Sequence, residues 1–385
     1  MLTHSVSQRT AHYLQLEDQF GAHNYHPLPV VLEKGEGVFV WDVDDKRYYD
    51  FLSGYSAVNQ GHCHPRIINK LIGQAKRLTL TSRAFYNNLL GEYEQYITAY
   101  FGYDKVLPMN TGVEAVETAI KLARRWGYAV KGIGDNKAKI IVCENNFHGR
   151  TSTVISFSSD PVAYKDFGPY MPGFEMVPFN NIAALEKSFQ DNNVAAFLAE
   201  PLQGEAGVVV PDDGYLKRVR ELCTDYNVLF VADEIQTGLS RTGKMLACDH
   251  EDVRADILIL GKALSGGTMP VSAVLADNSI MLNIKPGEHG STYGGNPLAC
   301  AVAIESLQVL KDEHMAENAA AMGELFRNEL QKLNSPLLKI IRGKGLLNAI
   351  VIDHPDLQAA WNLCLELKEN GLLAKPTHGD KIRLA

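Results

Sequence analysis

The sequence predicts an α/β protein with a large domain, built on a mainly parallel sheet covered by helices, and a smaller α+β domain. Short apolar runs at residues 139–143, 194–199 and 228–232 alternate with helical segments. Continuous apolar runs of this length are typical of parallel strands that are buried on both faces. Near the N-terminus, residues 38–43 and 47–51 flank Asp44-Asp45 and predict a small antiparallel unit.

The remaining elements follow from hydrophobic periodicity and from glycine and proline positions. We expect a helix within residues 1–24 and a polar loop over residues 53–64. We place an N-terminal segment that packs with the small domain at residues 1–64, a large domain at 65–290 and a C-terminal small domain at 291–385. Further helices are expected at 65–78, 88–101, 114–126, 216–226 and 298–310, and further strands at 105–110, 257–260, 271–276 and 349–352.

Composition narrows the classes of protein that fit. The 385 residues are 46% hydrophobic and 21% charged, and the net charge of −8 does not favour a nucleic-acid partner. We find no apolar run long enough to span a membrane, no secretory signal and no arginine-rich presequence. We therefore expect a cytoplasmic protein, or alternatively a mitochondrial matrix protein after presequence removal.

Six scattered cysteines without a C-x-x-C pair favour free thiols. His62-Cys63-His64 lacks the ligand spacing of metal sites, and we expect no metal there.

The stretch at residues 256–267 carries the first chemical signal. Lys262 follows the apolar run 257–260 and a glycine. A lysine at the end of a buried strand is costly to desolvate, which favours the neutral amine. A neutral amine can form a Schiff base with an aldehyde cofactor. Alternatively, Lys262 extends to solvent beside a turn, and this stretch alone leaves both interpretations open.

Other residues supply what a phosphorylated pyridine aldehyde would require. Asp233, at a strand end, would keep the ring nitrogen protonated. Thr111-Gly112-Val113 opens the helix at 114–126 and could hold a phosphate. Phe147 offers a flat face for the ring. Each has a plain alternative, because Asp233 could cap a helix, Phe147 could be a core residue and Arg150 a surface charge.

Longer motifs extend over nearly the whole chain. They are Gly21-Ala-His-Asn-Tyr-His-Pro-Leu-Pro-Val30, Val58-Asn-Gln-Gly-His-Cys-His-Pro65, Ser82-Arg-Ala-Phe-Tyr86, Met109-Asn-Thr-Gly-Val-Glu-Ala115, Glu200-Pro-Leu-Gln-Gly-Glu-Ala-Gly207, Asp233-Glu-Ile-Gln-Thr-Gly238, Gly287-Glu-His-Gly-Ser-Thr-Tyr-Gly-Gly295, Arg342-Gly-Lys-Gly-Leu-Leu347 and Asn370-Gly-Leu-Leu-Ala-Lys-Pro-Thr-His-Gly379. With these motifs the chain resembles the class III pyridoxal-phosphate-dependent aminotransferases of fold type I, most closely the branch that acts on ornithine.

The resemblance implies pyridoxal 5'-phosphate as cofactor and a homodimer with shared active sites. It assigns Lys262 as the Schiff-base lysine and proton carrier and Asp233 as the partner of the ring nitrogen. The remaining cofactor residues that it implies are Thr111, Gly112, Val113, Phe147, Ile235, Gln236 and, from the partner subunit, Thr292.

On the substrate side, the resemblance implies transfer of the δ-amino group of L-ornithine to 2-oxoglutarate. Tyr25 and Arg150 would hold the α-amino and α-carboxylate groups, and Tyr55 would line the pocket. Glu205 would pair with Arg383 and release it when 2-oxoglutarate arrives, and flanking glycines would let its loop move.

Several alternatives stay open on the sequence alone. Related enzymes act on N-acetylornithine or 4-aminobutyrate, an aminomutase could use the same fold, and an inactive relative could keep only the structure. Tyr25 favours a substrate with a free α-amino group, while intact Lys262 and Asp233 disfavour an inactive protein. The sequence ends at Ala385 where similar enzymes continue, so we expect an incomplete small domain.

Overall fold

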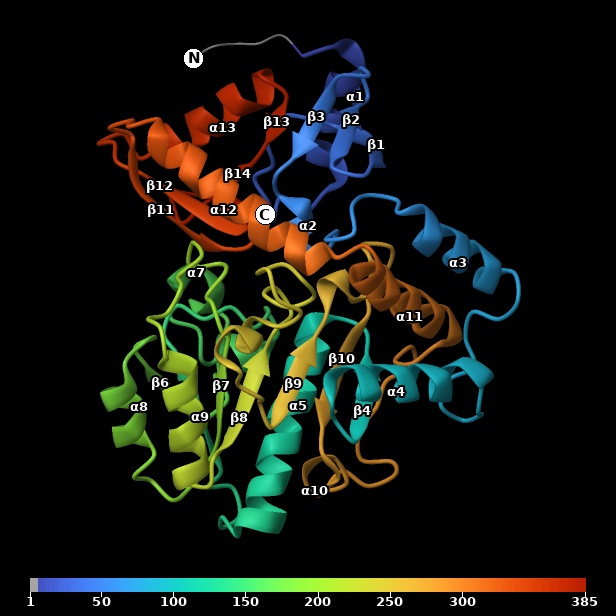
Figure 1. The fold of residues 1–385 in the computed structure, drawn as a ribbon, viewed down its shortest axis with the longest axis vertical. Helices are drawn as coiled ribbons and strands as arrows, with labels where there is room; N and C mark the ends of the chain where they lie inside the picture. Colours follow the sequence, from blue (N-terminus) through green and yellow to red (C-terminus); the bar gives the residue numbers. More distant parts are fainter. Residues whose placement is uncertain (1–5) are drawn as a thin grey trace.

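A computed structural model describes residues 6–385 of the chain (Figure 1). Its largest sheet has seven strands in the order β4-β10-β9-β8-β7-β5-β6. The pairs β5/β6, β5/β7, β7/β8 and β8/β9 are parallel, whereas β10 is antiparallel to both β4 and β9. The predicted large and mainly parallel sheet is therefore confirmed. Its strands are β4 Lys105–Met109, β5 Lys139–Cys143, β6 Phe174–Val177, β7 Val194–Ala199, β8 Leu229–Asp233, β9 Ile257–Leu260 and β10 Ser272–Ala276.

Helices cover both faces of this sheet, which explains its continuous apolar runs. Within β5, Ile140 and Val142 pack in one core cluster with α5 (Gly112–Trp126), while Ile141 packs in a second cluster with α9 (Tyr215–Asp225). Successive side chains of a strand point to opposite faces, so both sets must be apolar. In Figure 1, α5 and α9 lie beside the strands β7–β9 in the lower half of the molecule.

Two four-stranded sheets form the upper part of the molecule in Figure 1. One has the order β1-β2-β3-β13 and joins the two ends of the chain, because β13 pairs in parallel with β3. The other has the order β11-β12-β15-β14 and consists of antiparallel pairs. Their strands are β1 Leu32–Glu36, β2 Phe39–Asp42, β3 Arg47–Asp50, β11 Leu338–Lys344, β12 Leu347–Ile352, β13 Leu372–Leu373, β14 Lys375–Thr377 and β15 Lys381–Leu384.

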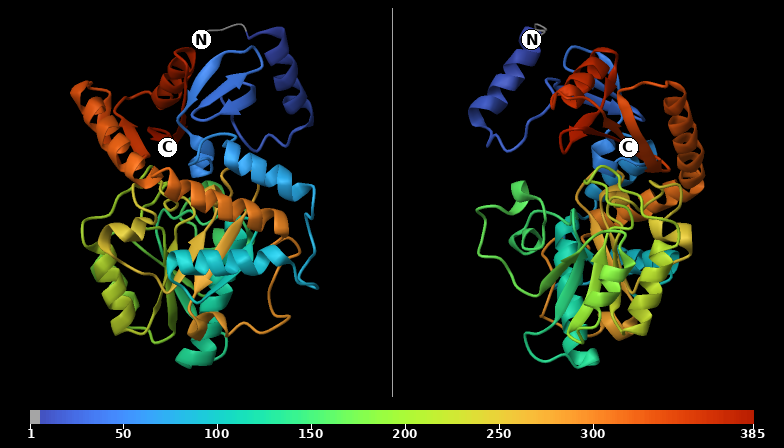
Figure 2. Two further views of the ribbon diagram at one scale, coloured as in Figure 1. Left: turned by 45° about the vertical axis from the view of Figure 1, so that its right-hand side comes forward. Right: turned by 90° about the vertical axis from the view of Figure 1, so that its left-hand side faces the viewer.

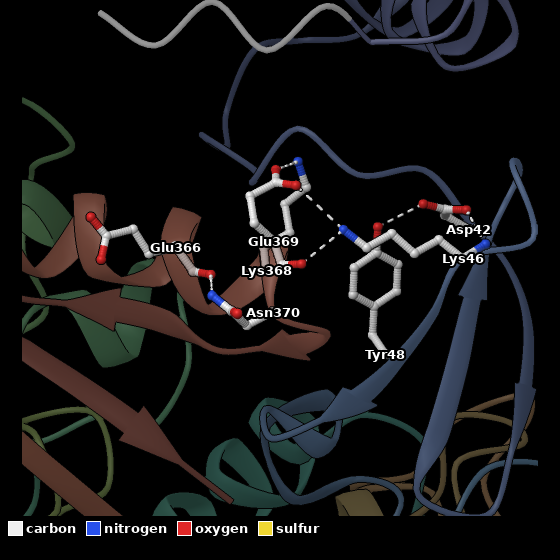
Figure 3. A network of polar contacts seen from close by, with 7 residues as sticks. All are labelled: Asp42, Lys46, Tyr48, Glu366, Lys368, Glu369 and Asn370. Carbon is white, nitrogen blue, oxygen red and sulfur yellow. Dashed lines mark hydrogen bonds and ion pairs between the residues drawn. The ribbon is translucent and has the colours of Figure 1, made fainter.

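Polar contacts fasten the N-terminal strands to α13 (Ala359–Glu369) (Figure 3). Lys46 Nζ donates to the carbonyl oxygen of Glu369 at 3.2 Å and to its carboxylate at 3.3 Å. The turn between β2 and β3 is stabilised by Asp42, which accepts a hydrogen bond from the Lys46 amide at 2.9 Å and one from the Tyr48 hydroxyl at 2.7 Å. Residues more than 300 positions apart thus form one structural unit.

The long helix α11 (Pro297–Asp312) packs against α3 (Pro65–Ala75) and α4 (Asn88–Phe101), and Figure 2 shows it running between the upper and lower parts. The division of the chain at 64/65 and 290/291 remains a prediction. The other helices are α1 Gln8–Phe20, α2 Ser53–Ser56, α6 Ser152–Ile155, α7 Pro161–Tyr164, α8 Ile182–Ser188, α10 Asn278–Met281 and α12 Met315–Lys332, with shorter turns at Gly127–Lys131, Ala247–Glu251 and Lys262–Ser265.

The segment expected to be a loop at 53–64 begins instead with the short helix α2, in which Ser53, Tyr55 and Ser56 have positive φ. All six cysteines are free thiols, as expected. Between residues 6 and 385, none of the helices combines the length and the apolar character that crossing a bilayer requires.

Candidate functional site

A cavity of about 200 Å³ lies at the carboxyl ends of the large-sheet strands β8 and β9. Ligands of open α/β sheets bind at such strand ends. Seven of the residues that the sequence singled out meet there. The lining consists of Gly112, Val113, Phe147, His148, Gly149, Glu200, Asp233, Ile235, Gln236 and Lys262.

The N-terminus of α5 supplies one wall of the cavity. Thr111 is the N-cap, and a capping box links its side chain and backbone to Glu114. The Thr111 amide is engaged, because it donates to the Glu114 carboxylate at 2.8 Å. The amides of Gly112 and Val113 lie in the first turn, where no intrahelical acceptor exists. They are the groups available to an anion, and the helix dipole favours one at this end.

Asp233 lies deep in the cavity, 3% exposed, at the end of β8. Its Oδ2 atom accepts a hydrogen bond from His148 Nδ1 at 2.7 Å, and its Oδ1 atom accepts one from the Ile235 amide at 3.1 Å. Burial acts to lower the pKa of His148, yet the hydrogen bond and the charge of Asp233 raise it. These two hydrogen bonds fix the orientation of the Asp233 side chain.

Lys262 opens the 3₁₀ turn that follows β9, with a φ of 46°. Burial lowers the pKa of its ammonium group, although the carboxylates of Glu205 and Asp233 oppose this shift. The solvent-extended alternative does not hold, since Lys262 lines the cavity with Asp233. A lysine with a lowered pKa is a better nucleophile and proton acceptor near neutral pH.

Phe147 and Ile235 supply apolar walls. The position of Ile235 explains the glycine at 112, because a Cβ atom there would lie 3.0 Å from the Ile235 Cδ1 atom. The Phe147 amide donates to the Glu200 carboxylate at 3.0 Å, and the Arg150 guanidinium lies 5.6 Å from the centre of the Phe147 ring. Arg150 faces a second, adjoining cavity of about 520 Å³.

A buried arginine marks the border between the two cavities. Arg383, on β15, has a side chain that is 2% exposed and pairs with Glu205 through Nη1 and Oε1 at 2.5 Å. The same Nη1 donates to Gln236 Oε1 at 3.1 Å, and the guanidinium lies 4.5 Å from the centre of the Tyr55 ring. Arg383 Nη2 is buried without a hydrogen-bond acceptor among residues 6–385. Although burial acts to raise it, the charge of Arg383 holds the pKa of Glu205 below its ordinary value.

Tyr25 and Thr292 line neither cavity. Tyr25 is 68% exposed. Burial raises the pKa of Tyr55, although the charge of Arg383 opposes this shift. Thr292 is exposed, one residue after Ser291, whose hydroxyl accepts a hydrogen bond from Asn110 Nδ2 at 3.0 Å. The individual roles of the site residues remain predictions.

The sequence reasoning gave no role to two buried residues of the site, His148 and Glu200. His148 orients Asp233, and its Nε2 atom is buried without a partner in the described part of the chain. Burial raises the pKa of Glu200 to about 7. Both residues stand in motifs that the sequence singled out, beside Phe147 and at the end of a predicted strand. Their function could not be read there, because it depends on contact with residues up to 85 positions away.

Comparisons with known proteins agree with this geometry. Residues 20–385 match the family described as aminotransferase class-III. The chain is 66% identical, over 96% of its length and 85% of the relative, to the Drosophila melanogaster protein named ornithine aminotransferase, mitochondrial. The crystal structure of ornithine aminotransferase from Toxoplasma gondii ME49 superposes with a TM-score of 0.96 at 50% identity and covers 99% of this chain and 90% of that one.

A third relative carries a different substrate name. The crystal structure of acetylornithine aminotransferase from Elizabethkingia anophelis superposes with a TM-score of 0.90 at 62% identity, covering 98% of this chain and 93% of that one. The match to the family extends from the first strands to the last residue. On this match and on the site that its motifs form, the chain belongs to the class-III aminotransferases.

Proposed function

We propose that this protein is a pyridoxal-phosphate-dependent ornithine δ-aminotransferase. It transfers the δ-amino group of L-ornithine to 2-oxoglutarate, which yields glutamate 5-semialdehyde and glutamate, and the semialdehyde closes to pyrroline-5-carboxylate with loss of water. The observation that carries the proposal is the buried Arg383–Glu205 pair beside Lys262. Ornithine and 2-oxoglutarate react in the same pocket, and only the half-reaction with 2-oxoglutarate needs a cation near the reacting carbon.

The residues of the smaller cavity fit pyridoxal 5'-phosphate. The unengaged amides of α5 suit a phosphate, the walls formed by Phe147 and Ile235 suit a flat ring, and Asp233 is a buried carboxylate with fixed orientation. When bound, the cofactor supplies an electron sink that stabilises negative charge at the carbon next to the reacting amine. A Toxoplasma gondii ornithine aminotransferase was crystallised with partial occupancy of PLP at its active site.

Each side chain then has one task. Lys262 Nζ would provide the amine that holds the cofactor and would take up the proton from the carbon that bears the reacting amine. The Asp233 carboxylate holds a proton on the ring nitrogen, and His148 keeps that carboxylate oriented. Phe147 and Ile235 exclude water from the reacting atoms.

The substrate end must treat two substrates differently. Ornithine presents a δ-amine with no carboxylate beside it, so a free arginine near Lys262 would attract its α-carboxylate and expose the wrong amine. Glu205 neutralises Arg383 in this half-reaction. 2-Oxoglutarate has a carboxylate next to its keto group, and Arg383 can bind it because Nη2 still lacks an acceptor. Arg150 and Tyr25 would hold the far end of ornithine.

A side-by-side assay tests the proposal. Purified holoenzyme is given ornithine, N-acetylornithine or 4-aminobutyrate with 2-oxoglutarate, and the products are followed by pyrroline formation and glutamate release. We expect ornithine to be the preferred donor, with pyrroline and glutamate formed in equal amounts. Turnover of N-acetylornithine alone would favour the activity named for the Elizabethkingia relative. Isomerised amino acid without a keto product would indicate an aminomutase.

We also infer a homodimer that shares its active sites. Thr292 is exposed in the single chain and borders Ser291 and Asn110 at the end of β4, close to the start of α5. A partner chain could therefore bring Thr292 to the phosphate. Mixing the inactive variants Lys262→Ala and Thr292→Arg should regenerate activity as subunits exchange, because one site in the mixed dimer is intact. Full activity of a monomer in dilute solution would rule out sharing.

The compartment is proposed as mitochondrial matrix or cytoplasm. Relatives from Drosophila melanogaster and Rattus norvegicus are named mitochondrial, which supports the first. Cell fractionation with antibody against this chain decides between them.

A further inference from the structure

The Glu205–Arg383 pair acts as a gate in the proposed function, because it opens when 2-oxoglutarate binds Arg383. Opening it leaves the Glu205 carboxylate without its cationic partner. When the carboxylate of 2-oxoglutarate takes Arg383, Glu205 loses the cation that it contacts in this structure. A carboxylate that stays partly buried without a cation or hydrogen-bond donors is costly. The Glu205 side chain is only 22% exposed and would keep only the hydrogen bond that Gln236 Nε2 donates at 3.3 Å, so it requires a second cationic partner within reach.

The cavity of about 520 Å³ that Glu205 lines is bordered by five basic side chains, two of which are histidines. Four of them already have other contacts. Lys381 pairs with Asp380 at 2.6 Å, His148 contacts Asp233 at 2.7 Å, His378 lies 4.0 Å from Asp160, and Arg150 is the expected contact of the substrate. The fifth is Arg342, which takes part in no ion pair within residues 6–385. Burial lowers the pKa of Arg342, and Asp380 only partly offsets this effect.

The register of the sheet places Arg342 next to Arg383. Arg342 on β11 pairs with Ala349 on β12, and Ala349 pairs in turn with Arg383 on β15. Directly paired residues of antiparallel strands point to the same face. The two arginines therefore share one face, about 10 Å apart across two strand spacings. Ala349 is buried between them and too small to separate their guanidinium groups.

The loop that carries Glu205 lies over both arginines. Arg342 Nε donates to the carbonyl oxygen of Gly207 at 2.8 Å, while Glu205 itself contacts Arg383. Val208 is buried in a cluster with Ala349, and the Thr377 hydroxyl donates to the carbonyl oxygen of Glu205 at 3.3 Å. These contacts hold the loop backbone, so rotation of the Glu205 side chain is the movement that the structure favours.

We propose that Arg342 is the second ion-pair partner of Glu205 and binds its carboxylate when 2-oxoglutarate or glutamate occupies Arg383. Arg342 is a positioning residue and does not touch the substrate. A guanidinium has five N–H donors, and the hydrogen bond to Gly207 uses only Nε. Its remaining donors can take a carboxylate without releasing the loop. The inference rests on the proposed ornithine and 2-oxoglutarate half-reactions.

A double-mutant comparison in single-turnover experiments tests the proposal with holoenzyme. Arg342→Gln should weaken the apparent binding of 2-oxoglutarate by about tenfold, as expected for loss of one charged hydrogen-bonded contact, and should affect ornithine much less. In a Glu205→Ala background, the same substitution should have no further effect on 2-oxoglutarate, because no carboxylate then needs a new partner. Arg342→Lys should restore most of the loss.

Matched controls distinguish this role from a general effect of charge removal on the small domain. Lys339→Gln removes a charge from the exposed part of the same strand and should change neither half-reaction. An equal loss from Arg342→Gln with and without Glu205 would overturn the proposal, as would the same pattern produced by Lys381→Gln. If ornithine yields no pyrroline at all, the proposed function fails instead, so the two failures are distinguishable.

A structural measurement covers the case in which Arg342→Gln does not fold. A crystal structure of the unaltered holoenzyme with glutarate, a dicarboxylate that cannot react, should show the Glu205 carboxylate within hydrogen-bond distance of Arg342. Glu205 in solvent, on Lys381 or still on Arg383 would refute the proposal.

Discussion

The two ends of the active site are built in different ways. At the cofactor end, Asp233 and Lys262 follow neighbouring strands of one sheet, and α5 begins at the same edge. At the substrate end, Glu205 comes from a loop after β7 of the large sheet, while Arg383 comes from β15 of another sheet. Side chains carried by one sheet keep fixed relative positions. The ion pair between Glu205 and Arg383 joins two separate parts of the structure, so it can break and re-form.

The two carboxylates that follow β7 show the same difference. Glu200 lies at the cofactor end, where burial raises its pKa to about 7. Glu205 lies five residues later, and Arg383 holds its pKa below the ordinary value in spite of burial. The first carboxyl group takes up a proton readily, while the second stays charged and needs a cation. This contrast suits a rigid cofactor site beside a movable gate.

Removing the lysine should give the largest effect. Lys262→Ala deletes both the amine that bonds the cofactor and the proton carrier, so we expect turnover to fall by more than about 10³-fold. Pyrroline formation measures the loss, and borohydride reduction followed by peptide mapping measures the covalent lysine–cofactor bond. Lys244→Ala, on an exposed loop, is the matched control. A reducible adduct that persists in Lys262→Ala would contradict the assignment.

Neutralising the acid should have the next largest effect. Asp233→Asn keeps the shape of the side chain but removes the charge that holds a proton on the ring nitrogen. We expect cofactor binding to persist in part and turnover to fall by about 10²-fold or more. Cofactor absorbance and steady-state rates measure the two effects separately. Near-normal turnover would mean that Asp233 serves only the fold.

Breaking the gate should alter selectivity more than rate. Glu205→Ala frees Arg383, so the glutamate half-reaction should gain about tenfold over the ornithine half-reaction, equivalent to ~1.4 kcal/mol. Transfer of the α-amino group of ornithine should also rise. Single-turnover spectra with each substrate give the ratio of rates. An unchanged ratio would show that the Glu205–Arg383 pair has no gating role and would remove the contrast between the two ends.

The cofactor end should also show a pH-dependent effect on stability, which turnover does not measure. The pKa of Glu200 is raised from its ordinary 4.5 to about 7, so the folded state holds this proton longer than the unfolded state. As pH rises from about 4.5 to about 7, the protein should lose stability relative to Glu200→Gln, by up to about 3–4 kcal/mol at ~1.4 kcal/mol per pKa unit. Urea unfolding of both proteins without cofactor across this range tests it, and parallel pH profiles would be the contrary result.

Local sequence was enough to predict that Asp233, Lys262 and the start of α5 lie at one edge of the large sheet. Apolar runs that end in Asp233 or Lys262 predict buried strands, and parallel strands bring their carboxyl ends to one edge of the sheet. The small residues before α5 likewise predict a helix start that can hold an anion. These features depend on hydrophobic periodicity and backbone geometry, which neighbouring residues determine.

The substrate end depended on the tertiary structure. Nothing near Arg342 in the sequence indicates that Ala349 lies between it and Arg383, because strand register decides which residues share a face. His148 and Glu200 likewise received their places from contacts across separate strands. Periodicity in one segment predicts which face is buried, but the charge that a buried side chain meets comes from another segment, and only the folded chain brings the two together.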